Sequence, residues 1–150
     1  MKRDKHDALF SKLIRERPNW TCEACQKYYP EGQRQGLHCS HFFTRSRKAV
    51  RWFPYNAAAH CYSCHTRLGG SPLNFADWIR DYLDNWWPDF PRSELSRLSN
   101  LTVRWRKKDM EELYEEMKSE LNRMESIRKH GFTGRIEFEL KKVQEMLVKS

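Results

Sequence analysis

Long apolar runs are missing from this sequence of 150 residues, of which 39% are hydrophobic. The mean hydropathy is −0.93, and no stretch approaches the ~18 consecutive apolar residues that span a bilayer. The charged beginning, residues 1–7, leads into no apolar core of the kind that a secretory signal has. We therefore expect no membrane association and no secretion, and we expect the protein to be cytoplasmic. The length suits one modest core or two small ones.

Carboxylates are also missing from a long internal stretch, because no Asp or Glu occurs between Glu31 and Asp77. Residues 1–70 contain 13 basic and 5 acidic residues, whereas residues 71–150 contain 15 of each, so the net charge of +8 lies entirely in the first part. A basic segment without acids attracts polyanions, of which nucleic acid is the commonest. A solvated basic face that serves only solubility is the alternative. The basic residues of this stretch are Arg34, Arg45, Arg47, Lys48, Arg51 and Arg67.

Two pairs of cysteines, each separated by two residues, indicate a metal site. Cys22 and Cys25 form the first pair, and Cys61 and Cys64 form the second. Two such pairs supply the four thiolates of a tetrahedral structural zinc site, which contributes folding energy. Disulfides would also fit four cysteines, but nothing here indicates secretion, so we favour zinc. The fifth cysteine, Cys39, is expected to be a small buried apolar residue.

Apolar periodicity predicts a helix that Asp7 caps and Pro18 ends, a strand-like segment over residues 37–43, and an amphipathic helix over residues 75–83. Past Pro91 the sequence changes character. A capping box of Asp109 and Glu112 predicts the start of a long helix that ends at Gly131. The apolar residues of this helix are Met110, Leu113, Met117, Leu121 and Met124.

A second apolar stripe, which begins after Gly134, predicts another helix, so we expect a C-terminal helical hairpin. The stripe consists of Ile136, Leu140, Val143 and Leu147. We expect two parts, a zinc-bound part over residues 1–92 and the hairpin region over residues 93–150. The apolar side of the hairpin would pack on the rest of the core or form a homodimer.

Three polar residues stand in a specific register around the cysteines. His41 lies 15 residues before Asn56, and His65 directly follows Cys64. This pattern indicates a ββα-metal site for phosphodiester hydrolysis, in which one histidine deprotonates water and another helps to bind a divalent ion. We assign His41 as the general base and His65 as the metal ligand. We expect the Asn56 amide to set the tautomer of His41 through the other ring nitrogen.

The segment from Asn56 to His65 resembles the HNH (His-Me finger) endonucleases, whose second half typically reads N-x4-C-x2-C-H. Residues from about 7 to 110 are more narrowly similar to the phage recombination endonucleases called NinG or Rap, through the helix that begins at Asp7, both cysteine pairs, His41, Arg45, and Arg51-Trp52. The resemblance implies an α+β fold with a zinc-stapled ββα-metal, treble-clef-like core and flanking helices.

The same resemblance implies structure-directed cleavage of DNA at branched recombination intermediates such as D-loops and Holliday junctions. It implies a structural Zn²⁺ and a catalytic Mg²⁺ or Mn²⁺, host or phage recombination proteins as partners, and the bacterial host cytoplasm as the compartment.

One position departs from the general HNH pattern, which places Asp or His directly before the base histidine as a metal ligand. Ser40 stands there in this chain. His38 could reach the ion, Ser40 could bind it weakly, or waters and DNA phosphates could complete its ligand set. A ligand set that contains histidine is also compatible with Mn²⁺ or another transition ion.

The basic residues between His41 and Asn56 are the candidates for DNA contact. They are Arg45, Arg47, Lys48 and Arg51, with Trp52 beside them. We expect the cations to contact phosphates, and Trp52 either to stack on an unpaired base or to fill the core. Two alternatives keep the zinc site: a non-catalytic nucleic-acid-binding module that recruits partners, and a sequence-specific HNH nuclease.

Overall fold

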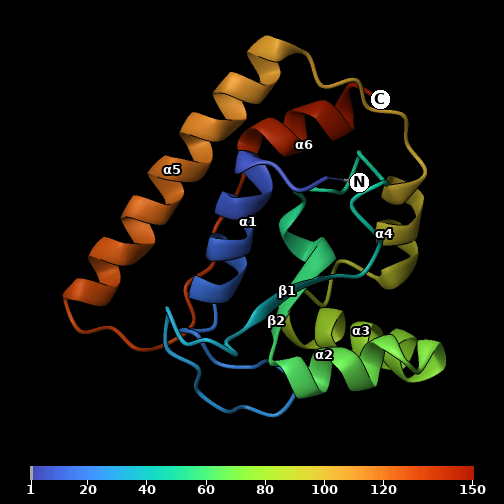
Figure 1. Ribbon diagram of the computed structural model, residues 1–150. Coiled ribbons are helices and arrows are strands. Elements are labelled where there is room, and N and C mark those ends of the chain that lie inside the picture. The colour runs from blue at the N-terminus through green and yellow to red at the C-terminus, as the bar shows by residue number, and fades with distance from the viewer. Residues whose placement is uncertain (1) are drawn as a thin grey trace.

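The computed structural model describes residues 2–150 and shows a mixed structure of helices and a small two-stranded sheet (Figure 1). The elements follow in the order α1 (Lys5–Glu16), β1 (His38–His41), the 3-10 turn η1 (Pro54–Asn56), β2 (Ala57–His60), α2 (Tyr62–Gly69), α3 (Pro72–Trp86), α4 (Arg92–Ser99), α5 (Lys107–Lys129) and α6 (Lys141–Val148). The predicted strand over residues 37–43 and the helix over residues 75–83 are confirmed as β1 and α3.

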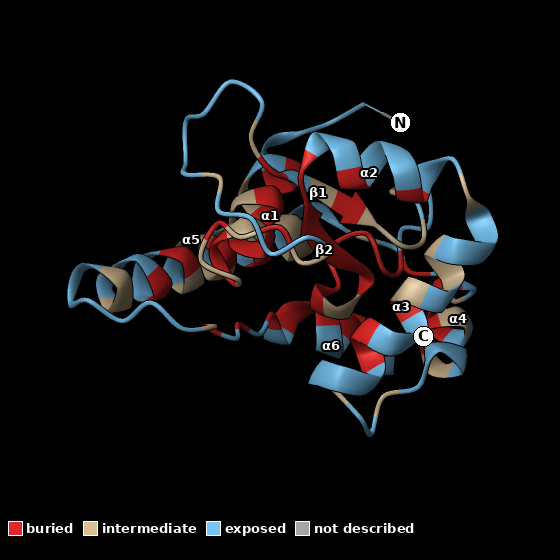
Figure 2. Ribbon diagram, turned by 90° about the horizontal axis from the view of Figure 1, so that it is seen from below, coloured by how far each residue is buried: buried red, intermediate tan, exposed pale blue. Residues whose placement is uncertain are grey.

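The sheet consists of two short antiparallel strands, in which His38 lies opposite His60 and His41 lies opposite Ala57. All four residues of β2 are buried, and three of them are alanines. Figure 2 shows the strands between α1 and α2, and both helices contact both strands. Alanine side chains are small enough for a helix to lie close to the strand. The sheet therefore holds the end of β1 between two helices.

Helix α1 begins one turn earlier than the sequence predicts. Asp4 is its N-cap, and Asp7 is the third residue inside the helix, where its carboxylate accepts from the Asp4 backbone N–H at 2.9 Å. The buried carboxylate of Asp7 also accepts hydrogen bonds from Arg51 and from the indole N–H of Trp52. The Arg51 guanidinium holds the pKa of Asp7 far below its usual range, although burial alone would raise it. Asp7 thus fastens α1 to the segment between β1 and β2.

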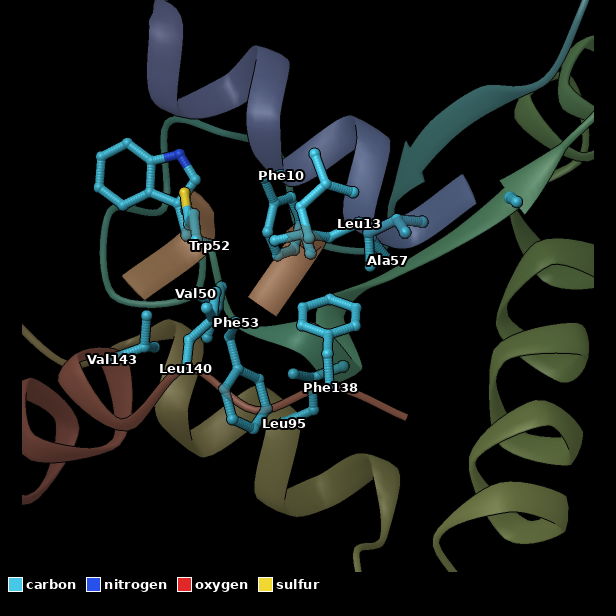
Figure 3. Packing of buried hydrophobic residues seen from close by; sticks show 14 of the residues in the cluster. Phe10, Leu13, Val50, Trp52, Phe53, Ala57, Leu95, Phe138, Leu140 and Val143 are labelled. Atoms are coloured by element: carbon cyan, nitrogen blue, oxygen red, sulfur yellow. The ribbon is translucent and has the colours of Figure 1, made fainter. Parts of the chain in front are cut away.

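One hydrophobic core extends across the predicted boundary at residue 92. Figure 3 shows Phe138 and Leu140 of the C-terminal segment close to Phe10 of α1, Phe53, and Leu95 of α4. The rings of Phe10 and Phe138 lie 6.4 Å apart. The apolar stripe of α5 is buried in the same core, and α5 packs along α1. The stripe that we considered for dimerisation is therefore used within this chain, and a dimer would need other residues.

The second helix of the predicted hairpin is much shorter than expected. It covers only Lys141–Val148, and residues 135–140 form neither helix nor strand, with Leu140 in an extended conformation. In this segment Ile136, Phe138 and Leu140 are buried, whereas Glu137 and Glu139 are exposed. Strict alternation of apolar and polar residues has the two-residue period of extended backbone, and here it overrides the helical spacing. The prediction of a helix that begins after Gly134 is therefore wrong.

Candidate functional site

The four cysteines of the two pairs come together, with their sulfur atoms all within 4.8 Å of one another. All four are free thiols, and the sulfurs of Cys25 and Cys61 lie 3.9 Å apart, far beyond disulfide length. Tetrahedral coordination at a Zn–S distance of about 2.3 Å would place sulfurs about 3.8 Å apart. The cluster of Cys22, Cys25, Cys61 and Cys64 could therefore hold a structural zinc ion.

The surrounding structure adjusts the acidity of these thiols. Burial raises the pKa of Cys22 to about 12. Burial would also raise the pKa of Cys61, but hydrogen bonds from the Cys64 backbone, the Tyr29 hydroxyl and neighbouring thiols lower it to about 7. The Cys61 sulfur is therefore the thiolate most readily available to a cation at neutral pH.

Glu23, inside the first cysteine pair, fixes that pair to the sheet. Its backbone N–H donates to the Ala59 carbonyl at 2.8 Å, and its carboxylate accepts from the Ala59 N–H, also at 2.8 Å. The other carboxylate oxygen accepts from Arg135 and from the Tyr82 hydroxyl, each at 2.6 Å. These contacts connect the zinc cluster to β2, α3 and the C-terminal segment.

A cavity of about 250 Å³ opens beside the end of β1. It is lined by side chains from α1, β1, α2 and the segments between them: Arg3, Asp7, Ser11, Arg15, Leu37, His38, Cys39, His41, Arg45 and His65. Three imidazoles and three guanidinium groups thus face one space. Of the predicted site residues, His41, His65, His38 and Arg45 meet here, whereas Ser40 and Asn56 lie behind the cavity wall.

The ring of His41 is fixed in one orientation. Its Nε2 lies 3.0 Å from the Arg51 carbonyl oxygen, and since a carbonyl can only accept, Nε2 carries the proton. The His41 ring also packs near the ring of Phe10, with 5.7 Å between the two ring centres. Burial lowers the pKa of His41 below its ordinary value, although the Arg51 carbonyl and Asp7 act in the opposite direction. His41 is therefore neutral at pH 7, with a lone pair on Nδ1.

The expectation that Asn56 contacts the ring of His41 is wrong. The side chain of Asn56 is fully buried, and both N–H groups of its amide donate to backbone carbonyls, to Phe43 at 2.9 Å and to Val50 at 3.0 Å. Its amide oxygen accepts from the Phe43 N–H at 2.9 Å. Asn56 therefore fixes the segment between the strands, and the carbonyl of Arg51, which this segment carries, sets the tautomer of His41.

Substitution of Asn56 by alanine is expected to lower the free energy of unfolding by about 2–4 kcal/mol, because it removes three hydrogen bonds to the backbone, two to Phe43 and one to the Val50 carbonyl, which keeps its bond from Phe53. Urea denaturation measures this change. The exposed Asn122 on α5 supplies the matched control, Asn122→Ala, which should shift stability by less than about 0.5 kcal/mol. Equal stability of the two variants would contradict the assigned role.

His65 lies at the start of α2, directly after the last cysteine. Its Nδ1 lies 2.7 Å from the hydroxyl of Ser40, which is buried on β1, and its ring stacks on His38 with 5.2 Å between centres. When Nδ1 donates to the serine oxygen, Nε2 keeps the lone pair that a metal ion needs. Burial and the neighbouring His65 lower the pKa of His38, which favours its neutral form.

The protein ligands for a second metal ion are few. Within residues 2–150, the four cysteines are the only group of three or more His, Cys, Asp or Glu side chains whose ligand atoms come together. Asp7 borders the cavity, but its two oxygens accept from Arg51, Trp52, Arg45 and the Asp4 backbone. An ion at Nε2 of His65 would therefore need oxygen ligands from water or from a bound phosphate, since the Ser40 hydroxyl lies on the Nδ1 side of the ring.

Arg15 is a candidate site residue that the sequence analysis missed. Its guanidinium stacks over Trp20 at 4.8 Å, and its Nε donates to the Ser11 carbonyl at 3.1 Å. No carboxylate within residues 2–150 forms an ion pair with it. Asp7, Ser11 and Arg15 follow at four-residue spacing and line the cavity together. Their four-residue spacing, which places them on one face of the helix beside the apolar face, is the signal that could have identified them.

The five residues predicted to contact DNA fall into two groups. Arg51 and Trp52 are buried, and both bond to Asp7, so the prediction that Arg51 contacts DNA is wrong and, of the two alternatives for Trp52, packing in the core is confirmed. Burial leaves no face of the Trp52 ring for a base. Arg45 borders the cavity, and Arg47 and Lys48, which follow shortly after it in the sequence, are exposed. These three remain candidates.

Comparisons with known proteins give no match: no family model, no curated protein and no solved structure is similar to this chain. The assignment of a function therefore depends on the residues of the site. Within residues 2–150, no helix has the length and apolar character required to cross a bilayer.

Proposed function

We propose that this protein is a metal-dependent DNA endonuclease that hydrolyses phosphodiester bonds in the cavity beside β1. The observation that carries this proposal is the placement of His41 and His65 on the wall of one cavity, together with Arg15 and Arg45. A module that only binds nucleic acid needs cations, but it does not need a neutral histidine whose tautomer is set by a buried carbonyl.

In the proposed reaction, Nδ1 of His41 takes a proton from a water molecule, whose oxygen attacks phosphorus in line with the 3′-oxygen. The bond between phosphorus and the 3′-oxygen breaks, and the departing oxygen takes a proton from solvent water, which leaves a 5′-phosphate and a 3′-hydroxyl. Arg15 and Arg45 face the cavity and would offset the charge that develops on the phosphate oxygens. His65 is the residue that would hold a divalent ion, through Nε2, while Ser40 fixes its ring from the Nδ1 side, and such an ion, when bound, stabilises the charge on the leaving oxygen.

The local order of elements supports the finer assignment. Two antiparallel strands, β1 and β2, are followed directly by α2, with His41 at the end of the first strand and His65 in the helix. This order agrees with a ββα-metal core of the HNH type, in which the zinc cluster would fix the position of His65. Branched recombination intermediates as preferred substrates remain a proposal that rests on the resemblance to the phage recombination endonucleases.

Cleavage of matched DNA substrates tests the proposal. The zinc-loaded protein is incubated with labelled duplex, single-stranded, forked, D-loop and four-way DNA in Mg²⁺, in Mn²⁺ or in EDTA. We expect metal-dependent nicking with 5′-phosphate ends, fastest on the branched substrates.

Binding without cleavage of any substrate in either metal would contradict the nuclease and support the non-catalytic zinc module. Cleavage of one duplex sequence in preference to all branched forms would support the sequence-specific nuclease instead.

A further inference from the structure

A second basic hollow lies away from the cavity of His41, at the beginning of α5. It has a volume of about 440 Å³, and its lining includes Arg104, Arg106, Lys108 and Lys149 around an apolar floor of Val103 and Met146. The first three cations are exposed and lie within five residues of one another. Because residues 71–150 are neutral overall, the net charge alone does not reveal this local group of cations.

The positive charges of this hollow have few negatively charged side chains near them. The one carboxylate side chain in its lining, Asp109, is engaged by Lys142 at 3.0 Å and by the backbone N–H of Arg106 at 3.1 Å. Arg104 and Arg106 form no ion pair with any side chain of residues 2–150, and Lys108 has only a distant one, at 3.9 Å from Glu112. Lys149 is paired with Glu145. Three cations are therefore available to an external anion.

Direct contacts join this hollow to the basic segment between β1 and β2. The indole N–H of Trp105 donates to the Lys48 carbonyl at 3.3 Å, and the Trp105 ring packs edge-to-face on Trp52 at 5.2 Å. The Arg47 guanidinium donates to the Asn100 side chain at 2.8 Å. Residues 100–106 thus contact the same segment that carries Arg45, Arg47 and Lys48, and Arg45 borders the cavity.

We propose that Arg104, Arg106 and Lys108 form a second phosphate-binding surface, which holds the DNA backbone beside the strand that enters the cavity. This inference rests on the proposed DNA substrate and adds a separate binding region to it. Exposed cations that lack partners bind phosphates with little dependence on base sequence, and they release counterions when they do so. Contact with the segment that carries Arg45, Arg47 and Lys48 favours a long polyanion over a small phosphate compound.

The double variant Arg104→Ala/Arg106→Ala tests this surface in the zinc-loaded full chain. Its affinity for a labelled 30-base-pair duplex and for a four-way junction is measured by fluorescence anisotropy across a series of salt concentrations. We expect affinity to fall by roughly tenfold, and the slope of log affinity against log salt to become less steep by about 2. The single variant Lys108→Ala should reduce the slope by about 1.

The matched control is Lys118→Ala/Lys129→Ala, which removes the same charge further along α5. Circular dichroism and zinc content, unchanged in all variants, establish that the fold is intact. Equal affinity and slope for the double variant and the control would overturn the proposed surface, as would failure of the unmodified protein to bind DNA.

Because these experiments measure binding and not cleavage, they test the phosphate-binding surface separately from the proposed nuclease activity. Salt-dependent binding through Arg104 and Arg106 without any cleavage would support the surface while contradicting the nuclease.

Discussion

Replacement of His41 by alanine is expected to reduce DNA cleavage by at least about 100-fold, since a positioned general base typically contributes 10²–10⁴-fold. The physical reason is specific to this ring. The Arg51 carbonyl holds the proton on Nε2, and burial keeps the imidazole neutral, so that Nδ1 is the base that the cavity offers. The rings of His38 and His65 stack on each other at another part of the cavity wall, where Ser40 holds His65.

The measurement is the single-turnover rate of nicking on the best substrate, with binding affinity and zinc content determined in parallel. His41→Ala should retain both, because His41 is neither a zinc ligand nor one of the exposed cations. His130→Ala is the matched control, since His130 is exposed at the end of α5. This variant should cleave DNA at the same rate as the unmodified protein. Full activity of His41→Ala would remove the proposed mechanism, whatever the DNA affinity.

The sequence predicted those parts of the site that depend on local spacing. Two cysteines separated by two residues can bind one ion in only a few geometries. Because His65 directly follows Cys64, the position of the cysteine cluster also determines the position of His65. His41 and His65 line the same cavity because β1 pairs antiparallel with β2 and α2 follows β2 directly. In short motifs of this kind, the spacing in the sequence itself determines how the side chains lie relative to one another.

The partners of the site residues could not be predicted in the same way. The group that orients His41 is a backbone carbonyl, and every residue has one, so no side-chain pattern identifies it. Asp7 bonds to Arg51 across 44 residues of sequence, and only the folded chain brings them together. The same contact explains why two residues that resemble DNA ligands in the sequence, Arg51 and Trp52, are buried.

The structure of the C-terminal segment could not be predicted from the sequence for a different reason. Residues 136–140 satisfy both a helical spacing, through Ile136 and Leu140, and a strict alternation. Alternation prevails because Phe138, which a helix would place on another face, fills the core beside Phe10. Where two periods overlap in a short segment, tertiary packing decides between them.

Loss of zinc is expected to have the largest effect on the fold. Structural zinc sites contribute an apparent 10–16 kcal/mol in small domains, which is comparable to the entire stability of about 5–15 kcal/mol of an ordinary protein. The cluster joins the loop after α1 to the turn between β2 and α2, next to the bonds between Glu23 and Ala59. Cys61→Ala should therefore release the ion and abolish the cooperative thermal transition.

Cys39→Ala provides the matched control, because Cys39 is the one cysteine outside the cluster. It removes a thiol without removing a zinc ligand, so zinc content should stay at one per chain and thermal unfolding should change only slightly. Metal release is followed with a chromogenic chelator, and unfolding is followed by circular dichroism. Since Glu23 still links the first cysteine pair to Ala59 in the Cys61 variant, some local order should survive. A cooperative transition at an unchanged temperature in that variant would show that the four sulfurs are close together for a reason other than metal binding.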